Sequence, residues 1–207
     1  MIDIKLDKFK IIACPGCYPT SIQLPLIPII KKRFINTKNI IIDSKSGYSG
    51  AGKNLFKKFK FKNIYDSISA YGISSHRHLA EIDQQLKKIS KSKIEVQFTP
   101  HLSPMFRGIL STIYVNLNKN ITARKIYKYL KKYYKNKHFI KFAKFNTAIG
   151  SGDIMHTNFC KISVCNDRIK NKAIILSTID NLIKGGSGQA MQNMNLLCGF
   201  NEQMGFK

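Results

Sequence analysis

The sequence lacks any apolar run long enough to cross a membrane as a helix, which requires about 20 consecutive residues. Its first ten residues alternate charged side chains with isoleucine and leucine, so they lack the apolar core of a signal peptide. We therefore expect no membrane partner. The five cysteines are an odd number scattered through the chain, which favours the reducing cytoplasm over a disulfide-stabilised secreted protein.

Acidic residues are also scarce, since 11 Asp and Glu stand against 35 Lys and Arg, a net charge of +24. Such an excess is typical of proteins that bind nucleic acid. Only five basic residues are arginine, however, and arginine makes most bidentate contacts to bases and phosphates. A lysine-rich composition alone would produce this pattern. We therefore expect no nucleic-acid partner, and a basic binding module remains an alternative.

The most informative stretch is residues 11–20, where an apolar β-branched run turns through Pro15 and Gly16 toward a helix that Thr20 could cap. Cys17 then lies just before a helix N-terminus, where free N–H groups and the helix dipole favour an anion. We therefore predict a lowered pKa and a nucleophilic role for Cys17. An ordinary buried thiol is the alternative.

Cys14 adds a second alternative, because Cys14 and Cys17 have the Cys-x-x-Cys spacing of dithiol oxidoreductases. A second Cys-x-x-Cys motif is absent, which argues against a four-thiolate zinc site. We expect no metal site.

The hydrophobic pattern predicts one α+β domain over residues 1–207, with a mixed, mostly antiparallel sheet covered by helices. Interior prolines cost about 3 kcal/mol, so the first helix should either kink at Pro25 and Pro28 or begin near Pro25. We expect residues 54–65 to be surface. Helices are predicted near residues 20–33, 78–89, 122–134 and 190–197, and strands at 39–43, 94–98, 109–117, 139–145, 159–165 and 173–179, the last two as a hairpin.

Four segments between these elements carry candidate functional residues. Residues 43–53 form a loop of small polar residues and glycines, suited either to an anion or to a plain surface. His76, Arg77 and His78 precede a helix with Glu81 one turn on, which is a candidate acid–base and anion site. The irregular link 99–108 brings His101 and Arg107. Residues 185–188 are a glycine-rich turn, a weak signal for phosphate or cofactor contact.

Five segments, namely the stretch around Cys17 and these four, resemble in their order N-acetyl-γ-glutamyl-phosphate reductases, which are relatives of aspartate-semialdehyde dehydrogenases. The matching segments are residues 14–20, 43–52, 76–82, 98–108 and 180–195. The resemblance implies a catalytic, dimer-forming domain of the semialdehyde-dehydrogenase and glyceraldehyde-phosphate-dehydrogenase type, and hence a homo-oligomer. Two departures stand out: the sequence contains no Rossmann unit, and Cys14 occupies a position where the family usually has asparagine.

The resemblance also implies a reaction, the NADP-dependent reduction of N-acetyl-γ-glutamyl phosphate to the semialdehyde in arginine biosynthesis. Cys17 would form a thioester, and His78 or His76 would act as the acid–base group, with Glu81 orienting the imidazole. The substrate would contact Arg77, Arg107, Ser44, Ser46 and Gly47. The nicotinamide side would be formed by Gly186, Gly188, Gln189 and Asn193.

The missing nucleotide-binding unit leaves an alternative within the family. We expect residues 185–207 to form a terminal helix that packs back on such a unit, and a separate Rossmann-domain chain is a candidate partner that would supply it. The alternative is a non-catalytic or split-gene remnant of the reductase. A dithiol protein would explain none of the other motifs, and a basic binding module would explain only the charge.

Overall fold

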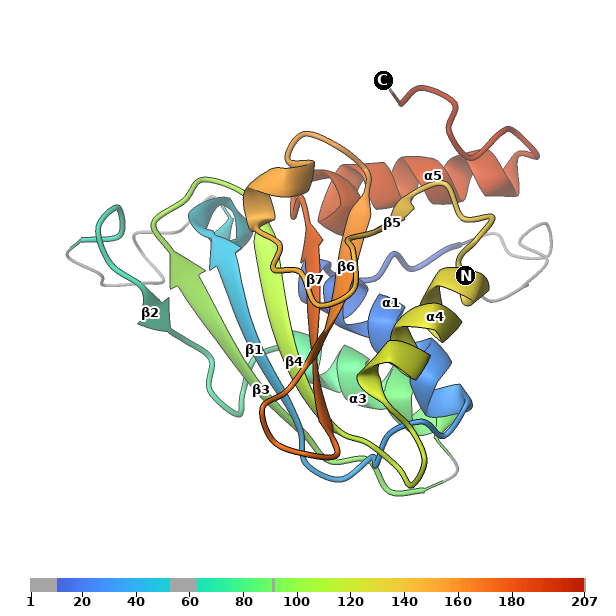
Figure 1. Ribbon diagram of the computed structural model, residues 1–207. Helices are drawn as coiled ribbons and strands as arrows, with labels where there is room; N and C mark the ends of the chain where they lie inside the picture. Colours follow the sequence, from blue (N-terminus) through green and yellow to red (C-terminus); the bar gives the residue numbers. More distant parts are fainter. Residues whose placement is uncertain (1–10, 53–62, 91, 207) are drawn as a thin grey trace.

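A mixed sheet of seven strands forms the centre of the fold in a computed structural model, which describes residues 11–52, 63–90 and 92–206. The strand order is β2-β3-β1-β4-β7-β6-β5 (Figure 1). Two pairings are parallel, β1 with β3 and β5 with β6, and the other four are antiparallel. This confirms the mostly antiparallel α+β sheet. The strands are β1 (Ile40–Gly47), β2 (Ser69–Ala70), β3 (Val96–Ser103), β4 (Ile109–Asn116), β5 (Ile140–Phe142), β6 (Cys160–Asn166) and β7 (Lys172–Ile179).

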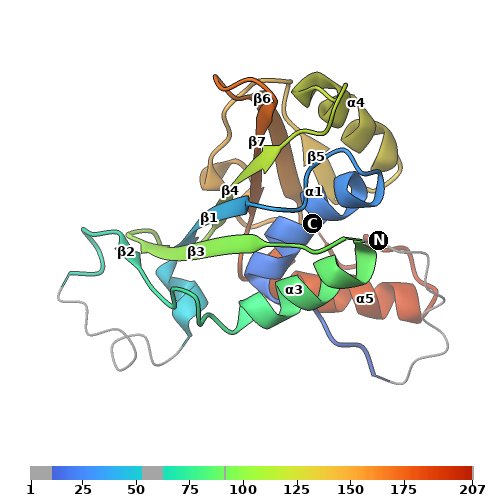
Figure 2. The same cartoon turned by 90° about the horizontal axis from the view of Figure 1, so that it is seen from below.

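Helices cover one face of this sheet. The helix α1 packs against β4 and β7, α4 packs against β6, and α3 lies beside α1 (Figure 2). In the described residues, no helix combines the length and apolarity needed to span a bilayer. The helices are α1 (Cys17–Lys31), α3 (His78–Ile89), α4 (Ala123–Tyr133) and α5 (Gly188–Leu197), with short turns η2 (Tyr48–Ala51), η3 (Ser151–Ile154) and η4 (Ile183–Ser187).

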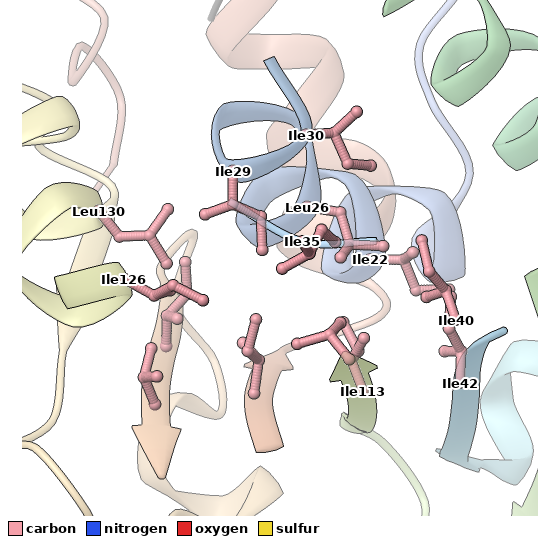
Figure 3. Packing of buried hydrophobic residues seen from close by; sticks show 14 of the residues in the cluster. Ile22, Leu26, Ile29, Ile30, Ile35, Ile40, Ile42, Ile113, Ile126 and Leu130 are labelled. Carbon is pink, nitrogen blue, oxygen red and sulfur yellow. The ribbon is translucent and has the colours of Figure 1, made fainter. Parts of the chain in front are cut away.

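Isoleucine and leucine side chains fill the space between the helices and the sheet. Figure 3 shows Ile22, Leu26 and Ile29 of α1 pointing toward the strands, with Ile126 and Leu130 of α4 beside them. All five are fully buried. Burial of each such side chain contributes roughly 1.5–3 kcal/mol, so this layer fixes α1 on the sheet and thereby fixes the position of its N-terminus.

The helix α1 begins at Cys17, earlier than either predicted start, and both prolines lie inside it. Pro28 cannot donate an N–H to the Leu24 carbonyl, and the Tyr134 hydroxyl donates to that oxygen instead, at 2.7 Å. Thr20 is not the N-cap; it lies in the first turn and donates its hydroxyl to the Gly16 carbonyl at 2.9 Å. A distant tyrosine thus supplies a bond that local sequence cannot reveal.

Two strands are longer than predicted. β1 continues through Gly47, and β3 continues to Ser103 through the segment expected to be irregular. Ser44 has the polarity of a loop residue but is fully buried, because its hydroxyl is 2.7 Å from the Ser111 hydroxyl, which is 2.8 Å from that of Ser21. Hydrogen bonding between strands and α1 therefore places small polar residues in the core.

Other predictions have mixed outcomes. The hairpin of β6 and β7 is confirmed, and so is the Thr122 cap of α4, whose side chain accepts a bond from the Lys125 N–H at 3.1 Å. β5 covers only Ile140–Phe142 of the predicted strand 139–145. Most of the segment 54–65 lies outside the described residues.

Candidate active site

A cavity of about 250 Å³ opens at the N-terminal end of α1. The start of α1, the end of β1, the η2 turn and the segment before α3 meet there. The residues that line it are Cys17, Tyr18, Ser46, Gly50, Ala51, Tyr71, His76, Arg77 and His78. The fold therefore brings the predicted nucleophile, both predicted acid–base histidines and one predicted arginine to a single cavity.

Cys17 is the first residue of α1, with Gly16 at the N-cap position. Burial raises the pKa of the Cys17 thiol, although the N–H groups of Tyr18 and Cys17 and the charge of Arg77 oppose this. The net direction is opposite to the lowered pKa predicted from the helix N-terminus, because the sequence could not show how far the thiol is removed from water. A buried thiol of this kind stays protonated near neutral pH.

The two histidines are held in defined and different ways. His76 Nδ1 accepts a hydrogen bond from the His78 backbone N–H at 3.1 Å, which in the neutral ring leaves the proton on Nε2. The His78 ring lies against Gly16, where a Cβ would come within 2.5 Å of Nε2. Its Nδ1 is buried without a hydrogen-bond partner in the described part of the chain.

Both imidazoles favour the neutral form. Burial, reinforced by His76 and Arg77, lowers the pKa of His78 to about 4. Burial and Arg77 also lower the pKa of His76. A neutral imidazole can accept a proton at its unprotonated nitrogen, which in His76 is already engaged by the His78 N–H. The cavity therefore combines a protonated thiol with one imidazole, that of His78, whose Nδ1 has no partner in the described chain.

Glu81 was expected to orient an imidazole, but its carboxylate bonds to a backbone N–H group instead. Both of its carboxylate oxygens accept from the Gly16 N–H, each at 3.2 Å. Burial raises the pKa of Glu81, and the Gly16 bond opposes this. The carboxylate therefore fixes the turn that precedes Cys17, a contact between residues 65 positions apart that sequence spacing could not indicate.

The residues predicted for the substrate lie at different depths. Ser46 lines the cavity, whereas Ser44 lies in the buried hydroxyl chain described above. Gly47 packs on the chain near Arg107, where a Cβ would come within 2.6 Å of the Arg107 nitrogen. Of these three, Ser46 alone is among the residues lining the cavity.

Two tyrosines at the cavity were not predicted. The Tyr71 hydroxyl donates to the Tyr18 hydroxyl at 3.1 Å, and the latter donates to the His101 carbonyl at 3.4 Å. Burial raises the pKa of Tyr18 and also raises that of Tyr71, to about 12, so both remain protonated at neutral pH. Tyr18 could have been identified as a cavity residue because it directly follows Cys17. No feature of the sequence indicated that Tyr71 lies there.

The two predicted arginines are not equivalent. Arg77 is exposed and lines the cavity. Arg107 is absent from the lining residues in the described chain; its Nη1 is 3.2 Å from Oδ2 of the fully buried Asp180 and 2.7 Å from Nδ1 of His156. Arg107 is thus engaged with its own chain.

The glycine-rich segment does not present its four predicted residues on one surface. Gly188 and Gln189 are buried, and a Cβ on Gly188 would come within 2.5 Å of Asn158 Oδ1. Gly186 and Asn193 are partly exposed, and Asn193 Nδ2 donates to Cys14 Sγ at 3.4 Å. The described residues contain no group of three potential metal ligands.

Gly185 was not predicted and lies directly on Cys17. A Cβ at this position would come within 2.5 Å of the Cys17 Cβ and 2.9 Å of its Cα. Only a residue without a side chain allows this approach. The signal would have been the adjacent pair of glycines after β7.

Known proteins resemble this chain over nearly all of its length. Residues 17–181 match the semialdehyde dehydrogenase dimerisation domain. The probable chloroplastic N-acetyl-gamma-glutamyl-phosphate reductase of Arabidopsis thaliana is 45% identical over 98% of this chain and 50% of its own length. The N-acetyl-gamma-glutamyl-phosphate reductase of Staphylococcus aureus (strain MRSA252) is 42% identical over 96% of this chain and 58% of its own length.

A solved structure shows the same fold. Aspartate semialdehyde dehydrogenase II from Vibrio cholerae superposes with a TM-score of 0.70 at 19% identity, over 89% of this chain and 61% of that one. The chain spans about half the length of the curated relatives it matches. The match over residues 17–181, together with the shared fold, shows that the chain belongs to the semialdehyde dehydrogenase family, through its dimerisation domain.

Proposed function

We propose that this chain is the catalytic part of an NADP-dependent reductase that converts N-acetyl-γ-glutamyl phosphate to N-acetylglutamate semialdehyde in cytoplasmic arginine biosynthesis. The observation that carries the proposal is the cavity in which Cys17 lies with His76, Arg77 and His78. The relatives at 42–45% identity that are named for this activity support it.

The first chemical step is acylation of Cys17. The sulfur attacks the acyl carbon, a C–S bond forms, and the C–O bond to phosphate breaks, so that inorganic phosphate leaves with the electron pair. Because burial raises the pKa of the thiol, its proton must pass to a base during attack. The neutral His78 imidazole is our first choice for that base, since its Nδ1 has no other described partner, and His76 is the second.

The remaining groups at the cavity bind and orient. The exposed guanidinium of Arg77 suits the substrate phosphate or carboxylate, because its planar donors match the geometry of both anions. Ser46 and the protonated tyrosines add hydroxyl groups to the wall. Arg107 bonds to Asp180 and His156, so its guanidinium supports the neighbouring turn, and its contact with the substrate stays a prediction.

The described residues do not fit a whole dinucleotide. The cavity of about 250 Å³ is small for such a ligand, and Gly188 and Gln189 pack inside the fold. NADP would therefore be held mainly by a nucleotide-binding unit on other residues or on a separate Rossmann-domain chain, with α5 and the following residues against it.

Homo-oligomerisation is part of the proposal. The sheet face opposite α1 and α4 carries partly exposed apolar side chains, including Ile41 (43%) and Tyr114 (38%), in adjacent strands. Such a face could form an interface with a second copy of the chain. The family model that matches residues 17–181 is described as a dimerisation domain, which supports this proposal. A remnant without catalysis remains the alternative function.

Acylation of the chain by an acyl phosphate tests the proposal. Wild type, Cys17→Ser and the matched control Cys14→Ser would be incubated with acetyl phosphate and N-acetyl-γ-glutamyl phosphate, and phosphate release and protein mass followed. We expect an acyl adduct on wild type and Cys14→Ser but none on Cys17→Ser. Equal adduct on all three proteins, or none on any, would refute the catalytic role.

A second measurement concerns the cofactor. We expect the chain alone not to oxidise NADPH with the acyl phosphate, and we expect a separately expressed Rossmann unit from a relative to restore that activity. Saturable NADPH binding by the chain alone at micromolar affinity would contradict the proposed division of labour.

A further inference from the structure

The turn η4 (Ile183–Ser187) lies on Cys17 and contains two adjacent glycines, so contacts with other parts of the chain must hold it in place. Gly185 lies on Cys17, and Gly186 adopts a non-helical conformation, with φ −152° and ψ −109°. Glycine has more backbone freedom than any other residue, so the sequence of the turn does not itself hold it against the thiol. One end is tied by the Gly185 N–H, which donates to the Asp180 carbonyl at 3.0 Å.

Lys184 ties the turn to a different part of the molecule. Its side chain is buried, and its Nζ donates to Gln192 Oε1 of α5 at 2.6 Å and lies 5.5 Å from the centre of the Phe139 ring. Gln192 Nε2 in turn donates to Glu202 Oε2 at 2.9 Å. The residue next to Gly185 is thereby connected to α5 and to the chain that follows it.

A buried ammonium group constrains its own position. Removing a charge from water is costly unless it is paired and hydrogen-bonded, so Lys184 is stable only where Gln192 and the Phe139 ring receive it. Burial lowers the pKa of Lys184 to about 8, while Cys160 and Glu202 oppose this. The acidic and thiol groups that face it are thus Cys160 of β6 and Glu202.

We propose that Lys184 is a positioning residue that holds the Gly185 backbone against the Cys17 side chain and so keeps the thiol buried. This inference deepens the proposed function, since it concerns the same thiol, but it rests on contacts rather than on the acyl-transfer reaction. Lys184 is not among the groups whose charge shifts the pKa of Cys17, which are Arg77 and Glu81. Its effect is therefore one of position.

The test compares alkylation of individual cysteines in Lys184→Met, in Gln192→Leu, which removes the partner, and in the double variant. Lys161→Met is the matched control, because Lys161 follows Cys160 in β6 and its ammonium group is bonded to Asp153 near the surface. Iodoacetamide labelling at pH 7.5 would be followed by mass spectrometry of each cysteine peptide. Urea unfolding followed by circular dichroism reports whether the fold of each variant is intact, and the fully buried Cys160 reports in the labelled sample whether opening extends to β6, where Cys160 faces Lys184.

We expect Cys17 labelling to accelerate about threefold or more in Lys184→Met and in Gln192→Leu, because each unit by which exposure lowers the thiol pKa gives about tenfold more thiolate. Cys160 should stay protected, the control should match wild type, and the double variant should match the single variants.

Three results would overturn the inference. Unchanged Cys17 labelling would show that Lys184 does not hold the turn. Slower labelling would show that its charge acts on the thiol directly. Equal acceleration at Cys17 and Cys160, together with a lower midpoint of urea unfolding, would show a general loss of stability. Because no acyl phosphate is used, the result is independent of whether the proposed reaction fails.

Discussion

Two clusters in the molecule contain the same residue types, arginine and histidine, but the polar atoms of these residues have different hydrogen-bond partners. At the cavity, Arg77 is exposed and His78 Nδ1 has no partner among the described residues. Behind the turn after β7, Arg107 Nη1 contacts both Asp180 and His156, and the His156 N–H also donates to Asp180 at 2.8 Å.

The difference separates a binding site from a structural network. Polar groups that face a cavity with free capacity can accept a ligand or a proton, whereas groups bonded to each other stabilise the chain that carries them. Asp180 illustrates the second case, because its Oδ1 also accepts from the N–H groups of Leu182 and Ile183. The sequence analysis assigned both Arg77 and Arg107 to the substrate. We now expect Arg77 to bind a ligand and Arg107 to stabilise the chain around it.

The largest expected effect is on the rate of Cys17 acylation. We expect His78→Asn to lower that rate about 10²- to 10⁴-fold through loss of the general base. His156→Asn should stay close to wild type, and asparagine tolerates the positive φ of 62° at that position. Phosphate release from an acyl phosphate measures both. If His156→Asn lost as much activity as His78→Asn, the comparison would fail.

The next effect is on stability. Asp180→Ala should lower the free energy of unfolding by about 3–5 kcal/mol, because it removes the fully buried carboxylate that accepts from the Arg107 guanidinium and from the backbone N–H groups of His156, Leu182 and Ile183. Arg77→Ala, at an exposed position, should change it by no more than about 0.5 kcal/mol. Urea unfolding followed by circular dichroism measures both. Similar losses in the two variants would show that the clusters do not differ as described.

A smaller effect is expected on the way in which the melting temperature depends on pH. The folded-state pKa values of His78, about 4, and of His76 lie below the ordinary value of 6.5. As pH falls below 6.5 the unfolded chain binds protons that the folded chain excludes, so stability is lost. We expect the melting temperature to fall less between pH 7 and 4.5 in His78→Gln than in wild type. Parallel curves would show that His78 is not held neutral.

The smallest effect concerns Glu81, whose charge raises the pKa of Cys17 slightly. Glu81→Gln keeps an oxygen for the Gly16 N–H and removes the charge, so the pKa of Cys17 should fall. Asp83→Asn on the same helix, where Asp83 pairs with Lys87, is the control. The pH dependence of Cys17 alkylation measures the shift, and a rise in Glu81→Gln would contradict the assignment.

Local pattern predicted the parts of the site that lie within one segment. The turn before Cys17 and the run from His76 to His78 could be recognised because neighbouring residues define them. Contacts between distant segments could not be predicted, since the bond from Gly16 to Glu81 and the approach of Gly185 to Cys17 depend on packing. The same limit explains Ser44, which has the polarity of a loop residue but is buried by hydroxyl partners on other elements.

The bond from the Tyr134 hydroxyl to the Leu24 carbonyl has a consequence for the order of folding. Because Pro25 and Pro28 have no N–H, α1 lacks two of the internal hydrogen bonds that it would otherwise form, which makes it weak in isolation. The partner that completes it lies 110 residues later, so a nascent chain that ends before α4 cannot close it. Contacts of such sequence separation form slowly. We therefore expect the helix that carries Cys17 to be completed late, after most of the sheet has been synthesised.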